Sequence, residues 1–127
     1  MTITGASCRV YDPLPIDNAA GFPQSFPFLL GRVSYQFTVY ADVPQAALGP
    51  IDELMTLPDA ARFLVVRADV LAADGSRRTI FLRKVVPSLE YLAGALALTF
   101  PTQIVARRNL NNAGTYGSNV VGGVAAR

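Results

Sequence analysis

The sequence predicts a mainly β domain: a small antiparallel sandwich or open barrel with one short helix and extended N- and C-terminal arms. Residues 32–43 alternate between apolar and polar side chains, as in a strand with one buried face. Residues 62–86 contain two β-rich runs joined through Asp74-Gly75, which is a strong hairpin signal. The first 31 residues are rich in proline, which disfavours helix.

The length of 127 residues is typical of one domain, which we divide into three parts. Residues 1–31 form a proline-rich arm, residues 32–106 the β core, and residues 107–127 a glycine- and asparagine-rich arm. The first arm has four prolines within residues 11–28 and also several large apolar side chains, which is too apolar for a plain disordered linker. We therefore expect it to lie as an extended strap on its own domain or on a neighbour.

The remaining elements follow from alternation and from the positions of proline and glycine. Strands are expected at residues 2–4, 32–43, 62–72, 77–86 and 95–108. Pro101 interrupts the last of these, where proline favours a bulge, a break or an edge position. Pro50 fits the first turn of a helix, and the acidic residues that follow suit its positive end, so a short helix is expected at about 50–57. Residues 88–94 are expected to form a loop or one helical turn.

The C-terminal arm needs something to hold it in place. Residues 109–127 contain four glycines, four asparagines and no acidic residue, and ordering each residue costs roughly 1–2 kcal/mol of backbone entropy. Its own domain or neighbouring chains must supply contacts, and we favour neighbours; removing residues 109–127 should then abolish assembly and leave the β core folded. The side chains expected at such a subunit interface are Phe22, Phe26, Phe28, Tyr116, Val120, Val121 and Val124.

The charge is distributed unevenly along the chain. Residues 1–76 carry four basic and eight acidic residues, a net charge of −4, whereas residues 77–127 carry seven basic residues and one acidic residue, a net charge of +6. Such halves can pair between copies or within one fold. The candidate contacts to an acidic partner or to phosphate, with solvated strand ends as the alternative, are Arg77, Arg78, Arg107 and Arg108. Nucleic acid is not favoured, because no aromatic residues closely interleave these arginines.

Residue types that usually perform catalysis or bind metals are scarce. The chain has no histidine and a single cysteine, Cys8, which excludes histidine-activated nucleophiles and cysteine clusters for zinc or iron–sulfur. Asp52 and Glu53 are adjacent and suit a helix start better than acid–base chemistry. We expect no enzymatic activity, metal or cofactor, with a carboxylate-based enzyme as the third option. Residues 89–100 are too short to span a membrane, which takes roughly 20 apolar residues.

Two stretches of the chain resemble virion structural proteins. The segment RFLVVRADVLAADGSRRTIFLRKVVPS (residues 62–88), followed by ALALTFPT, resembles the central strands of single-stranded RNA phage coat proteins. FLLGRVSYQFTVY (residues 28–40), together with the same hairpin, resembles small β proteins of phage tails and baseplates. The coat proteins end in amphipathic helices, which residues 111–127 cannot form, so tail or baseplate is favoured over coat.

These resemblances imply a non-enzymatic structural subunit of a phage or virus-like particle, assembled in the host cytoplasm and located in the virion. Its partners would be other copies of itself or other virion proteins, joined through edge strands and terminal arms. A second class of function stays open, which is a monomeric β-barrel binding module for a small apolar ligand. Its pocket would be lined by Tyr35, Phe37, Tyr40 and Phe63.

Overall fold

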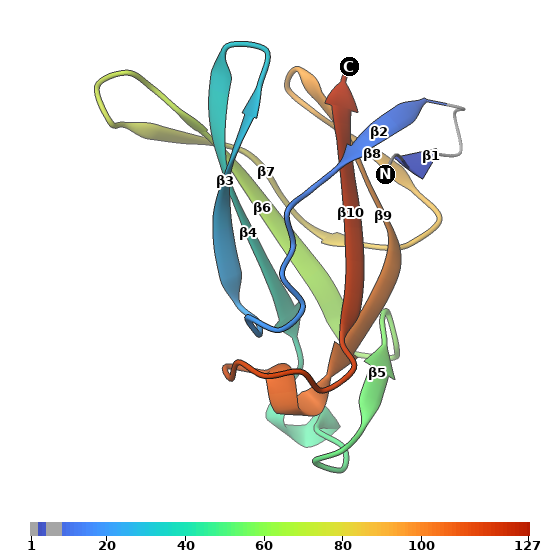
Figure 1. The fold of residues 1–127 in the computed structure, drawn as a ribbon. Coiled ribbons are helices and arrows are strands. Elements are labelled where there is room, and N and C mark those ends of the chain that lie inside the picture. Colours follow the sequence, from blue (N-terminus) through green and yellow to red (C-terminus); the bar gives the residue numbers. More distant parts are fainter. Residues whose placement is uncertain (1–2, 5–8) are drawn as a thin grey trace.

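The four-stranded sheet is built around the strand predicted at residues 32–43. In the computed structural model, which describes residues 3–4 and 9–127, this stretch forms β4 (Val33–Asp42). Within these residues the sheet has the antiparallel order β3-β4-β6-β7 (Figure 1). The other strands are β3 (Gln24–Leu30), β6 (Phe63–Leu71) and β7 (Arg77–Val85). The predicted hairpin is confirmed, and Gly75 at its tip has a φ of 86°, which glycine adopts at little cost.

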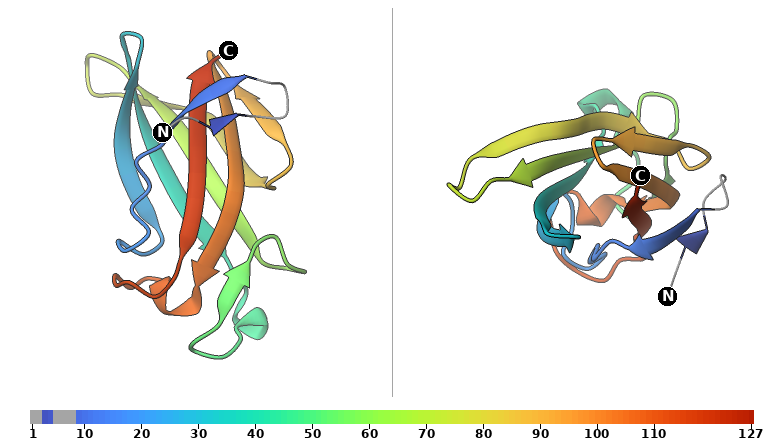
Figure 2. Two further views of the ribbon diagram at one scale, coloured as in Figure 1. Left: turned by 45° about the vertical axis from the view of Figure 1, so that its right-hand side comes forward. Right: turned by 90° about the horizontal axis from the view of Figure 1, so that it is seen from above.

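A second antiparallel sheet covers the first. Among the described residues it has six strands, in the order β1-β2-β10-β9-β5 with β8 also paired to β9. These strands are β1 (Ile3–Thr4), β2 (Val10–Pro13), β5 (Leu54–Thr56), β8 (Glu90–Ala93), β9 (Leu96–Ala106) and β10 (Asn119–Ala126). Figure 2 shows the two sheets as separate layers that do not close into a barrel. The predicted small antiparallel sandwich is confirmed.

The core lies between the sheets because alternate side chains of the facing strands point inward. Phe37 of β4, Leu64 of β6 and Leu98 of β9 have no exposed surface, and burying each such side chain contributes roughly 1.5–3 kcal/mol. Phe26 of β3 stacks on Phe37 with a centroid distance of 5.8 Å, and Phe28 meets the same ring edge-on at 6.3 Å. The aromatic side chains of the first predicted arm therefore belong to the core of this chain.

The prediction of a short helix at about 50–57 is wrong. A turn carries the chain past Pro50, whose carbonyl accepts a hydrogen bond from the Glu53 amide at 3.0 Å, and the next residues form β5 paired to β9. This strand buries Met55 completely, so pairing and burial override the local helix signals. Residues 88–94 likewise hold β8 instead of a loop or helical turn. The helical elements of the described residues are two 3-10 turns, η1 (Gln45–Ala47) and η2 (Arg107–Asn109).

The C-terminal segment is part of the sandwich. Strand β10 lies between β2 and β9, and its Val120 and Val124 are 2% and 0% exposed. The register shifts between Val121 and Gly123 opposite the stretch containing Pro101. Of the bulge, break or edge position expected at that proline, the structure therefore has the bulge. A Cβ on Gly122 would lie 2.8 Å from the Phe100 ring. The glycine in this strand therefore permits close packing beneath Phe100, and the segment is held by its own domain.

The N-terminal segment also lies on its own domain, the first of the two alternatives for the strap. The Asn18 side chain takes the place of a strand residue beside β10: it accepts from the Val120 amide at 2.7 Å and donates to the Val120 carbonyl at 3.3 Å. Farther along, the Phe22 amide donates to the Asn109 carbonyl at 2.8 Å, and the Phe22 carbonyl accepts from the Asn111 amide at 2.6 Å. The two ends of the chain therefore hold one another in place.

The phenol of Tyr11 connects β2 to β8 within the second sheet. The side chain has no exposed surface, and its hydroxyl donates to a carboxylate oxygen of Glu90. Burial, followed by the hydrogen bond to the Glu90 carboxylate, raises the pKa of Tyr11 to about 12 from the ordinary value of 10.

We expect the free energy of unfolding to fall as the pH rises from 10 to about 12, because the Tyr11 phenol of the unfolded chain loses its proton at lower pH than that of the folded chain. Below pH 10 both states keep the proton and this contribution is complete. Urea denaturation between pH 9 and pH 12 measures the slope. Tyr11→Phe should make the decline shallower, since that variant has no proton to lose there; equal slopes for both proteins would contradict this account.

Candidate functional site

The side chains predicted at a subunit interface are mostly buried within the chain. Phe22, Phe26, Val120 and Val124 are at most 9% exposed, so their prediction as contacts to a neighbour is wrong: they have almost no surface left to offer. Phe28 packs against the core and Val121 is half-buried. Tyr116 is 38% exposed and is the most accessible of this set to a partner.

A groove with a volume of about 850 Å³ lies where η1 and η2 come together, at the lower end of the molecule in Figure 1. Its lining is mostly apolar and comes from three stretches far apart in the sequence: the segment around Phe22, the chain from Tyr40 to Ile51, and the loop around Leu110. Arg107 and Arg108 are its basic residues. The groove therefore combines residues that the sequence assigned separately to an arm, a ligand pocket and a charged contact.

The pocket predicted for a small apolar ligand does not form from the residues expected. Tyr40 lines the groove, but Tyr35 and Phe37 are 3% and 0% exposed within the core. Phe63 lies apart from the groove lining, with the Lys84 ammonium 4.5 Å from its ring centroid. The alternation in β4 put Tyr35 and Phe37 on the face that packs against the other sheet.

The two arginines of η2 have different surroundings. Arg107 belongs to the framework, because its amide donates to the Glu53 carbonyl at 2.9 Å and its guanidinium donates to the Gly49 carbonyl. Arg108 is exposed, and its guanidinium lies 5.8 Å from the centroid of the Tyr116 ring. Among the ion pairs formed by the described residues, none involves Arg108. Arg108 is therefore available to a partner, whereas Arg107 fixes the loop before β5.

That loop, residues 50–53, lies beside the groove, to whose lining its Ile51 contributes, and is called the acidic loop below. Ile51 and Leu54 are 57% and 52% exposed. A smaller hollow of about 220 Å³ lies between the loop and η2, and Asp52 and Arg108 both contribute to its lining. Glu53 pairs with Arg62 at 2.9 Å, but the described part of the chain offers Asp52 no ion pair.

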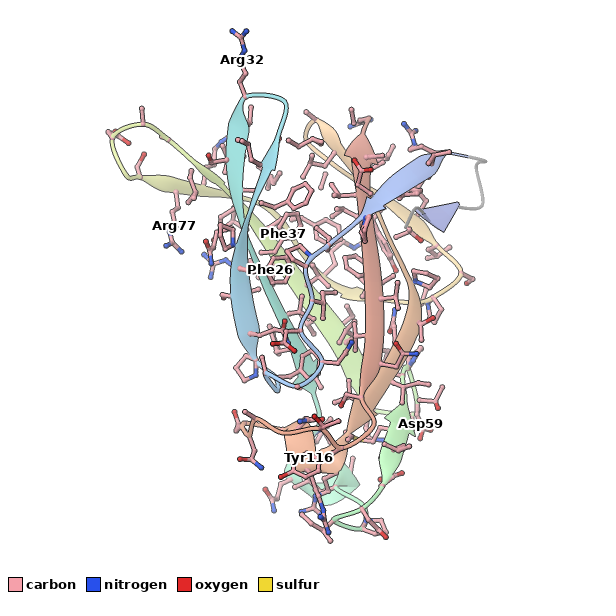
Figure 3. All side chains as sticks on the ribbon, in the orientation of Figure 1. Phe26, Arg32, Phe37, Asp59, Arg77 and Tyr116 are labelled. Carbon is pink, nitrogen blue, oxygen red and sulfur yellow. The ribbon has the colours of Figure 1, made fainter. Side chains whose placement is uncertain are left out.

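Arg77 and Arg78 lie on a free edge of the four-stranded sheet. Strand β7 pairs with β6 on one side, and no strand of the described residues pairs with its other side. Lys84, on the same strand, lies 3.9 Å from the Asp42 carboxylate, whereas Arg77 and Arg78 are fully on the surface. Figure 3 shows Arg77 near the hairpin and Tyr116 at the lower end of the molecule, so the two arginine pairs belong to separate surfaces.

The buried carboxylate beside this edge is structural. Asp69 is 3% exposed and accepts from the Thr79 hydroxyl at 2.6 Å and from the Arg67 guanidinium at 3.1 Å. Burial raises the pKa of Asp69, but Thr79 and Arg67 together outweigh burial and hold the pKa below its usual value. A carboxylate that stays ionised and accepts hydrogen bonds from both neighbours links β6 to β7 and is poorly suited to proton transfer.

The described residues contain no group of three or more His, Cys, Asp or Glu side chains placed to hold a metal ion; Cys8 and Thr2 lie outside them. Within the same residues, no helix is long and apolar enough to cross a membrane. No family model, curated protein or solved structure matches the chain.

Proposed function

We propose that this chain is a non-enzymatic structural subunit of a phage or virus-like particle, in the tail or baseplate before the coat, and that it assembles through the free edge of β7. The supporting observation is a strand of nine residues that, among the described residues, has a partner on one side only. Its pairing with β6 is continuous from Phe81 to Val85 and shifts register between Thr79 and Phe81. Its unpaired N–H and C=O groups form a template to which a strand of a neighbour can add.

The chemistry of this edge selects its neighbour. Proline lacks the amide donor of a ladder, and β3, at the opposite edge of the same sheet, contains Pro27, which makes that edge a poor template. Strand β7 has no proline and presents Arg77 and Arg78. The charge opposes pairing of β7 with the β7 of another copy and favours a segment that carries carboxylates. In the purified protein, β7 of one copy is therefore expected to pair with a segment from the first 76 residues of the next copy, which carry a net charge of −4.

Light scattering on the purified protein tests this proposal. We expect species heavier than the single chain of 13.6 kDa, increasing with protein concentration. Arg78→Glu should move assembly to roughly tenfold higher concentration, because it reverses the charge that attracts the neighbour. The matched control is Arg32→Glu, an equal charge change at an exposed arginine of the β3–β4 hairpin (Figure 3), which should assemble as the unmodified protein does. A mass of one chain at every concentration would contradict the proposal.

A further inference from the structure

Exposed apolar side chains gather at the end of the sandwich that holds the groove. Ile51, Leu54 and Tyr116 are 57%, 52% and 38% exposed. Ile51 and Tyr116 line the same small hollow, and a Cβ on Gly117, next to Tyr116, would lie 3.2 Å from the Leu54 side chain. Single exposed apolar residues are ordinary, but a cluster beside an apolar groove is typical of an interaction surface.

The same surface carries one cation and one anion without ion-pair partners. Asp52 projects from the acidic loop and Arg108 from η2, both exposed, and neither takes part in an ion pair within residues 9–127. The hydrogen bonds from Arg107 to Gly49 and Glu53 tie η2 to the base of the loop. Loop and groove are therefore held side by side as one unit.

The acidic loop carries Asp52 and lies beside the groove, and Arg108 lies at the groove lining. After a two-fold rotation, the loop of one copy therefore faces the groove of a second copy, and each Asp52 faces an Arg108. In such an interface residue i of one copy contacts residue j of the other, and j contacts i. A foreign acidic segment would satisfy Arg108 and leave Asp52 without a partner, whereas a second copy satisfies both charges at once. The charges therefore favour the copy over an unrelated occupant.

We propose that two copies of this chain form a two-fold dimer in which the acidic loop of each lies in the groove of the other. Ile51 of one copy contacts the apolar lining near Leu48 and Leu110 of its partner, and Asp52 of one copy pairs with Arg108 of the other. This inference goes beyond the proposed function, because it names the occupant of a surface separate from β7.

Reciprocal charge reversal tests the dimer. In an Arg78→Glu background, which suppresses association through β7, Arg108→Glu alone brings together carboxylates at both reciprocal contacts, and Asp52→Arg alone brings together guanidiniums. Each variant should dimerise at least about tenfold more weakly than the background protein. An equimolar mixture of the two restores both attractive contacts, so native mass spectrometry should detect a mixed dimer with an affinity within about threefold of the background protein.

Two further measurements decide the outcome. Ile51→Gln should weaken the dimer, whereas Val10→Gln, at a side chain 60% exposed on β2, should not. A mixture with no mixed dimer, or Ile51→Gln and Val10→Gln with equal affinities, would overturn the inference. The proposed function would stand without the dimer if either of these outcomes occurred while the unmodified protein still assembled and Arg78→Glu reduced that assembly. If only the mixed dimer formed, the role of β7 would fail and the dimer would stand.

Discussion

Deletion of Asn119–Arg127 is expected to unfold the domain, because it removes strand β10 from the interior of a sheet. Strand β2 reaches β9 only across β10 in the described sheet order, so the deletion separates the N-terminal segment as well. Val120 and Val124 leave the core, and the amides and carbonyls of β9 that pair with β10 lose their partners. Far-UV circular dichroism should show loss of the β signal, and thermal scans should show no cooperative transition. Because β10 lies inside the sheet, removal of residues 109–127 is likewise expected to unfold the domain, in contrast to the folded β core expected from the sequence.

Two experiments separate loss of a strand from loss of chain length. Deletion of Arg127 alone, which lies beyond β10, should leave the thermal transition nearly unchanged. A synthetic peptide of residues 119–127, added to the truncated chain, should restore the β signal by filling the vacated strand position. A truncated chain that melts cooperatively near the temperature of the full-length protein would show that β10 is dispensable.

The parts of the fold that sequence predicted were those with local signals. Alternation in residues 32–43 and the Asp74-Gly75 turn act over a few neighbours, and β4 and the β6–β7 hairpin follow from them. The tail was misjudged because its composition was taken as conformational freedom. In β10 the inward positions fall at Val120 and Val124, with two glycines between them. Phe100, whose ring leaves no room for a Cβ at Gly122, lies elsewhere in the sequence.

The candidate sites, too, were predictable only where the signal was local in the sequence. Charge counting identified Arg107 and Arg108, but nothing local distinguishes a guanidinium tied to the Gly49 carbonyl from one that is free for a partner. The groove could not be predicted, because its walls come from three separated stretches. One signal was present and misread: Ile51 and Leu54 flank acidic residues, which we interpreted as the apolar side of a helix instead of an exposed loop beside a strand.

Asn109→Ala is expected to destabilise the protein by about 2–4 kcal/mol, because it leaves several buried polar groups without partners. The Asn109 side chain has no exposed surface; its amide donates to the carbonyls of Asn112 and Gly114 at 3.2 and 2.8 Å. Its oxygen accepts from the Ser118 hydroxyl at 2.6 Å, and that hydroxyl accepts from the Ala106 amide at 2.8 Å. One side chain thus shapes the loop between β9 and β10 and the lip of the groove.

Asn109→Asp distinguishes the role of the donor from that of side-chain volume. The aspartate has nearly the same size and can still accept from Ser118, but an ionised carboxylate cannot donate to the two carbonyls. Urea denaturation at pH 7 should therefore place Asn109→Asp at least as low in stability as Asn109→Ala. The matched control is Asn112→Ala, on the same loop with an exposed side chain, which should change stability by less than about 0.5 kcal/mol. If Asn109→Asp were as stable as the unmodified protein, the donated hydrogen bonds would not be what holds this loop, and its conformation would have to follow from packing around Phe22 and Leu110 instead.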